Sequence, residues 1–286
     1  MWSIVEEERA VATKADWMGR VGKEWAKRSD ALDALLAPVG DVGLQKMGGV
    51  AGEQILDLGC GAGTTALALA QTGATITGVD VSPDLLGLAA ERDEADAVNW
   101  VLGDASAIKY PTAFDGLYSR CGAMFFDQPM IAFAHLRFQM RPGARLVVVC
   151  WRDAEQNAWA RVPLEAAQDI LGAEMTALPP AGGIGPFGWA RAQTFIDILQ
   201  STGWSDLEHD PVDRLAPVGQ VDDDDPLESA VAQCLRIGPL ASRLRAAPPT
   251  TKTLVADALR KTLERFQHKD GAVKLGSAAW VISARA

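Results

Sequence analysis

Three carboxylates, Asp57, Asp80 and Asp104, each follow a short apolar segment in the first half of the chain. Asp57 is followed by the turn Gly59-Cys60-Gly61-Ala62-Gly63, and helix-forming residues come next, from Ala66 to Ala70. Glycines take positive φ and let backbone amides approach a ligand, and a helix that begins there offers unpaired N–H groups. The pattern therefore predicts a binding site for a ligand that carries a nucleoside.

The details of the turn and of the acids narrow the class of ligand. A dinucleotide-binding turn has the pattern GxGxxG, whereas the third glycine here is Gly63, which gives GxGxG. A carboxylate at Asp57 would repel a pyrophosphate and suits a ligand with an ammonium group. Asp104, within Gly103-Asp104-Ala105, is placed to hydrogen-bond an adenine amino group. These features favour a nucleoside with an amino-acid tail over a dinucleotide.

Alternating strands and helices must bring these residues to one edge of a sheet. The apolar pattern predicts strands at 54–58, 74–79, 98–102, 114–119 and 145–151. It predicts helices at about 64–71, from Pro83 onward and at about 128–140, the last stopped by Arg141-Pro142-Gly143. Continuously apolar strands indicate a parallel sheet that is covered on both faces. We therefore expect an α/β fold with a doubly wound, mainly parallel sheet, whose ligands bind beyond the carboxyl ends of the strands.

Three motifs in this order, ILDLGCGAG, GVDVSPDLL and GDA, resemble the class I S-adenosylmethionine-dependent methyltransferases. The resemblance implies a Rossmann-like fold and S-adenosyl-L-methionine as cofactor. It also implies that Gly59, Cys60 and Gly61 pass close to the methionine part of the cofactor. Asp57 is then expected near the ammonium group of that part.

The same resemblance assigns the nucleoside end of the cofactor. Asp80 is expected to accept hydrogen bonds from both ribose hydroxyls, and Val81 to pack on the adenine. Asp104 is expected to accept from the adenine amino group, while the backbone amide of Ala105 donates to a ring nitrogen.

Further segments are similar to a bacterial group of small-molecule methyltransferases, so that the resemblance covers nearly the whole chain. Arg120 lies where the residue after the fourth strand faces cofactor and substrate, with a buried ion pair as the alternative. Cys121 and Gly122 depart from the group, which more often has an aromatic residue before this glycine, and the change would open space in the pocket. The segments are 119–126, Arg141-Pro142-Gly143, Trp151-Arg152, Phe187 in GPFGWA, and AAWVISARA.

Aromatic and sulfur-bearing side chains are expected to form the wall of the acceptor pocket. Such a wall suits an apolar or aromatic acceptor and attracts a sulfonium by cation–π interaction. Arg28, three residues after Trp25, is expected to reach the carboxylate of the cofactor. Packing in the core is the open alternative for each of these residues. The expected wall consists of Met124, Phe125, Phe126 and Trp151, with Trp17 or Trp25 from the N-terminal region.

The catalytic residue stays open. The sulfonium makes its methyl group electrophilic, so transfer needs mainly alignment and a dry pocket. Arg120 and His135 are the candidates, with a structural role as the alternative for His135, and neither lies in a recognised catalytic motif. Two other functions also stay open: use of the bound sulfonium for elimination, decarboxylation or dehalogenation, and cofactor binding without turnover.

Composition limits the partners of the protein. With 286 residues, 48% of them hydrophobic, and a net charge of -10, the chain does not favour nucleic acid or anionic membranes. Its four scattered cysteines contain no CxxC pair, so we expect neither a zinc site nor a disulfide framework. The acidic N-terminus is unlike a signal peptide, and no stretch is apolar enough to span a membrane. We expect a cytoplasmic protein with a small-molecule substrate and leave its oligomeric state open.

Three parts are expected along the chain. Residues 1–50 form a helical segment that contributes to a lid, and residues 51–151 form the cofactor-binding core. Residues 152–286 complete the core with a helix at about 191–201 and strands at about 204–211 and 278–283. Helical insertions in this third part are expected to cover the substrate pocket and to select the acceptor.

Overall fold

The computed structural model describes residues 13–221 and 223–286, so residues 1–12 of the expected N-terminal segment lie outside the described residues. At the centre is a seven-stranded sheet with the order β3-β2-β1-β4-β5-β7-β6. Strands β1 to β5 are parallel, whereas β7 is antiparallel to both of its neighbours. The predicted doubly wound, mainly parallel α/β fold is confirmed. The strands are β1 (Gln54–Leu58), β2 (Thr75–Asp80), β3 (Val98–Leu102), β4 (Phe114–Arg120), β5 (Met140–Trp151), β6 (Ser205–Pro217) and β7 (Lys274–Arg285).

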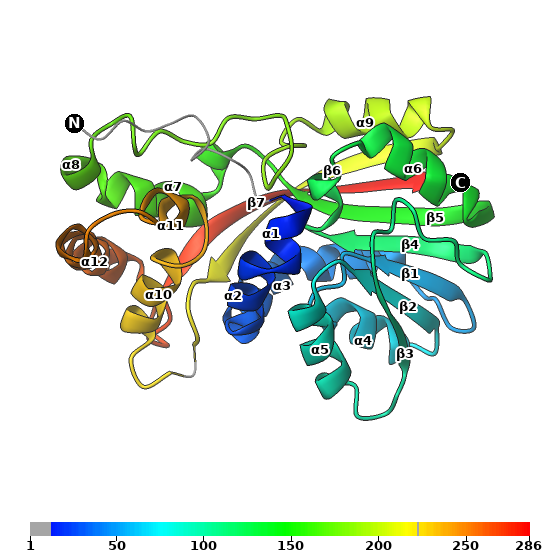
Figure 1. Ribbon diagram of the computed structural model, residues 1–286, viewed down its shortest axis with the longest axis horizontal. Coiled ribbons are helices and arrows are strands. Elements are labelled where there is room, and N and C mark those ends of the chain that lie inside the picture. The colour runs from blue at the N-terminus through cyan, green and yellow to red at the C-terminus, as the bar shows by residue number, and fades with distance from the viewer. Residues whose placement is uncertain (1–12, 222) are drawn as a thin grey trace.

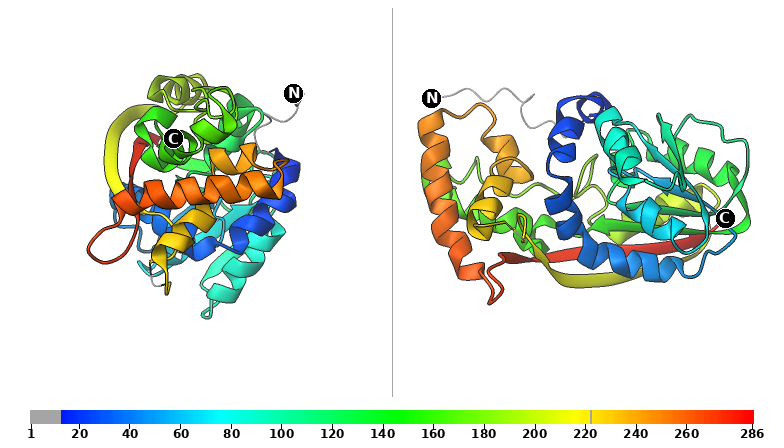
Figure 2. Two further views of the ribbon diagram at one scale, coloured as in Figure 1. Left: turned by 90° about the vertical axis from the view of Figure 1, so that its left-hand side faces the viewer. Right: turned by 90° about the horizontal axis from the view of Figure 1, so that it is seen from below.

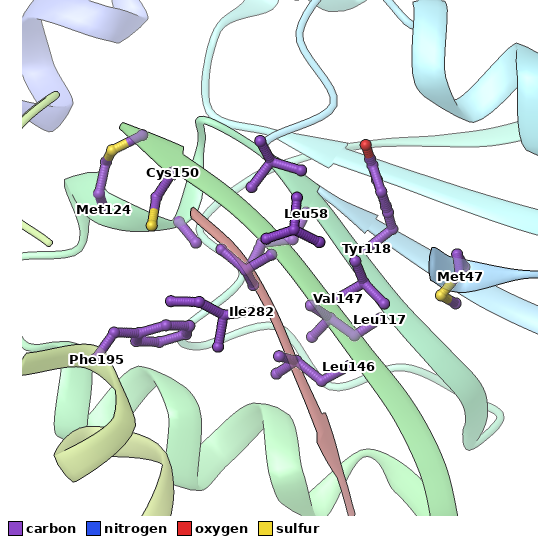
Figure 3. Packing of buried hydrophobic residues seen from close by; sticks show 14 of the residues in the cluster. Met47, Leu58, Leu117, Tyr118, Met124, Leu146, Val147, Cys150, Phe195 and Ile282 are labelled. Carbon is purple, nitrogen blue, oxygen red and sulfur yellow. The ribbon is translucent and has the colours of Figure 1, made fainter. Parts of the chain in front are cut away.

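Helices cover both faces of this sheet (Figure 1). On one face lie α3 (Ser29–Met47), α4 (Thr64–Ala70) and α5 (Pro83–Arg92), and on the other lie α6 (Pro129–Phe138) and α9 (Ala192–Ser201). The central strands are therefore buried on both sides, as the fully buried Leu56 and Leu117 illustrate. Figure 3 shows this packing, with Phe195 of α9 and Ile282 of β7 on one side of β5 and Tyr118 and Met47 on the other. Strand order reverses between β1 and β4, which places a ligand-binding crevice beyond their carboxyl ends.

Two short helices precede α3 at this edge. They are α1 (Lys14–Met18) and α2 (Arg20–Ala26), and α1 begins at the N-cap Thr13. Helix α2 approaches α5 closely at Gly22, where a Cβ atom would lie 2.1 Å from Ser82 Oγ and 2.3 Å from the Trp17 carbonyl oxygen. Because no larger residue fits there, Gly22 sets how tightly the N-terminal helices close over the edge of the sheet.

A separate helical lobe is carried by the long strands β6 and β7. Figures 1 and 2 show these two strands running out of the sheet and into a group of helices at the far end of the molecule. The lobe has its own hydrophobic core, which includes Val162, Val231, Leu259 and Leu275. Its helices are α7 (Ala158–Ala166), α8 (Gln168–Leu171), α10 (Pro226–Cys234), α11 (Pro239–Arg243) and α12 (Pro249–Leu263). The 3-10 turns of the described residues are η2 (Ala123–Phe125), η3 (Ala154–Gln156) and η4 (Glu264–Phe266).

Several boundaries differ from those that the sequence predicts. Helix α6 ends at Phe138, and Arg141-Pro142-Gly143 lies inside β5 rather than in a turn. The register shifts between Phe114 and Gly116 opposite this segment, and a proline is tolerated in a strand at such an irregularity. Strands β6 and β7 extend beyond the predicted 204–211 and 278–283, because they pair with each other into the lobe. Among the helices of residues 13–221 and 223–286, none is long and apolar enough to cross a membrane.

Candidate functional site

A cavity of about 300 Å³ lies beyond the carboxyl ends of β1, β2 and β4. Its walls come from the loops after these strands and after β3, from helices α1 to α3, and from η2 and the start of α6. The volume falls within the range of small-molecule sites. Of the three predicted acids, Asp80 and Asp104 line this cavity, whereas Asp57 is buried next to it and is not a lining residue.

The glycine turn after β1 forms the floor of the cavity. Gly59 and Gly61 have φ of +65° and +56°, values that favour glycine. A Cβ on Gly59 would lie 3.0 Å from the Cα of Gly122, so the turn after β1 and the turn after β4 pack backbone to backbone. Among the described residues, no heavy atom beyond those of Gly61 and its two chain neighbours lies within 4 Å of a Cβ position on Gly61. Cys60 and Gly61 both line the cavity. The turn thus presents bare backbone to a ligand, as the sequence predicts.

Asp80, at the end of β2, is fixed by backbone amides. Its Oδ2 accepts from the Gly61 amide and its Oδ1 from the Ser82 amide, each at 2.9 Å. Burial raises the pKa of Asp80, while these amide hydrogen bonds work in the opposite direction. The carboxylate and the neighbouring Val81 both line the cavity. Each oxygen retains a lone pair, so the group can accept two further hydrogen bonds from a diol.

Asp57 lies directly beneath the glycine turn and is fully buried. Its Oδ2 accepts from the Thr65 hydroxyl at 2.6 Å, whereas its Oδ1 has no hydrogen-bond partner among the described residues. Burial raises the pKa of Asp57 to about 6, and the Thr65 hydrogen bond and the Arg120 charge oppose that rise. A buried carboxylate oxygen without a donor is costly, which makes it a marker for a group that the site is built to receive.

Asp104 lies at the other end of the cavity, where α1 crosses it. The Lys14 ammonium donates to Asp104 Oδ2 at 2.7 Å, and the Ser106 amide and hydroxyl donate to Oδ1 at 2.9 and 2.6 Å. Burial works to raise the pKa of Asp104, but Lys14 and Ser106 together hold it below its ordinary value. Lys14, Asp104 and the buried Ala105 all line the cavity.

Arg120, at the end of β4, extends into the same cavity and forms an ion pair with Asp33. Its Nη2 lies 2.7 Å from Asp33 Oδ1, and 9% of its side chain is exposed. Sequence reasoning missed Asp33, whose other oxygen accepts from Thr64 Oγ1 at 2.7 Å and from Arg92 Nη1 at 3.0 Å. The available signal was an acid in the middle of the apolar helix segment LDALL.

Three aromatic rings form one wall of the cavity. Trp17 of α1 contacts both Trp25 of α2 and Phe125 of η2 edge to face, with ring centroids 5.0 and 5.1 Å apart. All three line the cavity together with Phe126. The Nε1 of Trp17 is buried and has no hydrogen-bond partner among the described residues. The wall is therefore apolar with one free N–H donor.

Comparison with known proteins identifies a domain within the chain. Residues 56–148 match a family described as "Methyltransferase domain". Over 132 residues the chain is 32% identical to an uncharacterized protein of Mycobacterium tuberculosis, a match that covers 44% of this chain and 48% of the relative. The chain contains a class I S-adenosylmethionine-dependent methyltransferase domain.

Other similarities agree with this assignment. Over 175 residues the chain is 31% identical to the O-methyltransferase resE of Aspergillus sclerotiorum, covering 59% of this chain and 61% of the relative. The chain spans about half the length of the curated relatives it matches first. Its fold resembles a Bacillus halodurans protein described as a methyltransferase, with 16% identity, a TM-score of 0.54 and coverage of 87% and 98%. It also resembles the [4+2]-cyclase SpnF, with 18% identity, a TM-score of 0.53 and coverage of 96% and 97%.

The residues of this methyltransferase domain fit its cofactor, S-adenosyl-L-methionine. The unpartnered Oδ1 of Asp57 matches an ammonium group, and the bare backbone of Gly61 leaves room for a ligand to approach. The fixed carboxylate of Asp80 matches a ribose diol. When bound, the cofactor supplies an electrophilic methyl group. The chain itself supplies donors and acceptors at the positions that hold the ends of such a molecule.

Five of the predicted site residues do not line the cavity of the methyltransferase domain: Asp57, which is buried beneath the glycine turn, and Met124, Trp151, His135 and Arg28. Met124 is buried in the core beside Cys150 (Figure 3), and Trp151 packs against Trp159 with ring centroids 5.1 Å apart. His135 lies in the second half of α6, where its Nε2 donates to the Ile108 carbonyl at 2.7 Å. Arg28 lies in a separate recess between the start of α3 and residues 220–233.

Spacing explains these differences in position. A residue next to a strand end faces the ligand or the core depending on how the chain turns, and the turn after β4 directs Phe125 to the cavity and Met124 inward. Arg28 is the N-cap residue of α3 and follows the bend after α2. Its side chain therefore does not lie on the same side as that of Trp25, which lines the cavity. Burial and the nearby charge of Arg236 lower the pKa of Arg28, which further distinguishes this recess from the cavity.

Neither histidines nor ionised thiols line the cavity within the described part of the chain. Burial raises the pKa of Cys121 to about 12 and raises that of Cys60 well above its ordinary value, so both thiols stay protonated at neutral pH. Within residues 13–221 and 223–286, no group of three or more His, Cys, Asp or Glu side chains is arranged to hold a metal ion.

Proposed function

We propose that the protein transfers the methyl group of S-adenosyl-L-methionine to a small apolar or aromatic acceptor. The observation that carries this proposal is that the wall of Trp17, Trp25 and Phe125 faces the same cavity as the glycine turn. An acceptor ring packed on this wall lies beside the methionine end of the cofactor. The rings also favour a sulfonium by cation–π attraction.

Catalysis in this proposal rests on orientation. Asp80, Asp57 and Asp104 hold the cofactor by its ribose, ammonium and adenine. The aromatic wall holds the acceptor and excludes water, and alignment of this kind raises the rate of displacement by several orders of magnitude. Among the described residues no histidine lines the cavity, and the carboxylates that line it are weak bases, so we expect an acceptor atom that loses its proton to solvent easily or has none. The relative resE is named an O-methyltransferase, which supports a hydroxyl oxygen of an acidic phenol as that atom.

The test uses the purified chain, methyl-labelled S-adenosyl-L-methionine and a panel of phenols and other aromatic acceptors. We expect label in at least one aromatic product. Phe125→Ala should lower transfer to that acceptor by roughly 10-fold or more, through loss of a packed ring. Phe138→Ala serves as the matched control, since that phenylalanine is 90% exposed on α6 and does not line the cavity.

The two alternatives from the sequence predict different results. If the sulfonium is used without transfer, an acceptor changes chemically while no label reaches it. If the protein binds the cofactor without turnover, calorimetry shows binding and the whole panel stays unchanged. The fold it shares with SpnF does not decide among these alternatives, because identity of 18% shows the fold alone.

The proposal extends to the partners of the protein and to its location in the cell. The acidic composition supports a small-molecule partner rather than a nucleic acid. The resemblance to a bacterial group supports a bacterial, cytoplasmic enzyme. None of the described residues of 152–286 lines the cavity. The helical insertions that are expected to cover the substrate pocket would therefore act at the mouth of the cavity rather than in its wall.

A further inference from the structure

The proposed cofactor carries a carboxylate as well as an ammonium group on its amino-acid tail, and the structure changes which residue can bind it. Arg28, the sequence-based choice, lies in a different recess. Among the described lining residues, the cations are Lys14 and Arg120. Lys14 pairs with Asp104 at the end where the adenine is expected, so Arg120 is the cation available to the tail.

The position of Arg120 suits this role. Strands β1 and β4 are neighbours with Asp57 opposite Tyr118, so the end of β4 lies level with the start of the glycine turn. The charge of Arg120 also acts on the buried Asp57. A cation and an anion therefore lie on the same side of the turn, in an arrangement complementary to the two charges of an amino acid.

Helix α3 is shaped to hold this arginine. A Cβ on Gly40 would lie 2.7 Å from Arg120 Cδ, so the absence of a side chain there lets the arginine run along the helix. Asp33, on the same helix, accepts from Nη2 and leaves the rest of the guanidinium fork without a partner among the described residues. Asp33 is partly buried and is shared with Arg92, which also pairs with Asp30. The N–H donors of Arg120 that do not face Asp33 are available to a second anion.

We propose that Arg120 binds the carboxylate of the cofactor's amino-acid tail and that Asp33 is a positioning residue that aims the guanidinium at it. The planar fork of an arginine can donate two parallel hydrogen bonds to a carboxylate, which fixes both distance and orientation. With Asp57 on the ammonium, the tail is held at two points, and the methyl group is held with it. This inference rests on the proposed function, since it takes S-adenosyl-L-methionine as the ligand.

The decisive experiment compares two ligands that differ in the carboxylate alone. S-adenosyl-L-methionine and its decarboxylated analogue are titrated into the wild-type chain and into Arg120→Gln by calorimetry. We expect Arg120→Gln to weaken binding of S-adenosyl-L-methionine by roughly 10- to 100-fold, as for a lost charge-assisted hydrogen bond, and to change binding of the analogue by less than about threefold. Arg120→Lys keeps the charge without the fork and should fall between the two.

Asp33 is tested through the ratio of the two affinities. Asp33→Asn should lower the preference for S-adenosyl-L-methionine over the analogue by roughly 3- to 10-fold, because the guanidinium loses its orientation. Arg92→Gln is the matched control: Arg92 bonds the same carboxylate but does not line the cavity, so the ratio should stay unchanged. A purely structural role of Asp33 would weaken both ligands equally.

Each other outcome overturns a defined statement. Equal losses for both ligands in Arg120→Gln show that the arginine supports the fold and does not bind the carboxylate. Unchanged affinity for both, with a raised KM for the acceptor, shows that it binds the acceptor. Failure of the wild-type chain to bind either ligand overturns the proposed function itself, which separates that failure from failure of this inference.

Discussion

The carboxylates at the two ends of the cavity differ in burial and in hydrogen bonding. At the end formed by β3 and α1, Asp104 is partly exposed and both of its oxygens have donors, one of them the Lys14 ammonium. At the end formed by β1, β4 and α3, Asp57 is fully buried and one of its oxygens has no donor among the described residues. The first end is satisfied without a ligand. The second leaves one buried carboxylate oxygen without a donor in the part of the chain that the structure describes.

The difference indicates where specificity for the cofactor resides. An exposed ion pair contributes little to stability or binding, because solvent screens it. A buried charge without a partner lowers stability, and a ligand that supplies the partner recovers the loss. We therefore expect substitutions at the buried end to have larger effects than substitutions at the exposed end.

The largest effect is expected for Asp57→Asn on the stability of the ligand-free protein. The folded-state pKa of about 6 lies above the ordinary value of 3.8, so the folded protein retains a proton that the unfolded chain loses between these values. Stability therefore falls as the pH rises through this window, and the cost is complete above pH 6. Removing the charge should raise the free energy of unfolding at pH 7.5 by up to about 3 kcal/mol.

Urea denaturation measures this effect at two pH values. At pH 4 the folded Asp57 is already protonated, so Asp57→Asn should leave the free energy of unfolding nearly unchanged. The exposed Asp41→Asn on α3 is the control and should be neutral at both pH values. The same Asp57→Asn protein should bind S-adenosyl-L-methionine less tightly. A variant that is destabilised at pH 7.5 would show that the buried charge is compensated after all.

The second effect concerns Asp80, which lies between the two ends. Its carboxylate is oriented by two amides before any ligand binds, so its hydrogen bonds to a ribose need no rearrangement. Asp80→Ala should weaken cofactor binding by roughly 2 kcal/mol or more, through loss of charge-assisted hydrogen bonds. Calorimetry with S-adenosyl-L-methionine measures the change. Unchanged affinity would mean that the ribose lies elsewhere in the cavity.

The strand ends that carry the three acids were the most predictable part of the molecule. Strands β1 and β3 occupy the predicted residues 54–58 and 98–102, since each is a short apolar run that stops at a polar residue or glycine. Asp57, Asp80 and Asp104 could be placed because parallel strands bring their carboxyl ends to one edge. The confirmed fold and cofactor follow from this regularity.

The remaining features depend on contacts between distant segments. Strand β6 is mostly exposed, so no alternation of apolar residues marks its full length. The ion pair between Asp33 and Arg120 joins a helix to a strand end that is far away in the sequence, and neither residue alone reveals the other. Whether Met124 or Phe125 faces the cavity depends on the geometry of one 3-10 turn. Local patterns carry no information on such pairings.

A third prediction uses pH to separate the two ends. The charges that act on Asp57 are Arg120, which lowers its pKa, and Asp80, which raises it. Because the ammonium of the cofactor prefers the ionised carboxylate, affinity should fall as the pH drops through 6. Between pH 7 and pH 5 we expect a loss of roughly tenfold, measured by calorimetry. Asp57→Asn should remove most of this dependence, whereas a variant at Asp104 should retain it.

The smallest effect is expected at the exposed end, for Lys14→Gln. The Lys14 and Asp104 side chains are 47% and 26% exposed, so their ion pair is screened by solvent. Asp104 keeps both hydrogen bonds from Ser106 and can still accept from an adenine amino group. We expect cofactor affinity to fall by less than about 1 kcal/mol, through loss of the tie between α1 and the sheet edge.

The dependence of cofactor affinity on salt concentration gives a second test of the Lys14–Asp104 ion pair. The wild-type affinity should approach that of Lys14→Gln at high ionic strength, because the ion pair weakens as salt is added. Lys27→Gln is the matched control. Lys27 follows the end of α2, pairs with Glu24 of that helix and does not line the cavity. A loss for Lys14→Gln as large as that for Asp80→Ala would erase the distinction between the ends. It would make α1 a direct part of the adenine site rather than its cover.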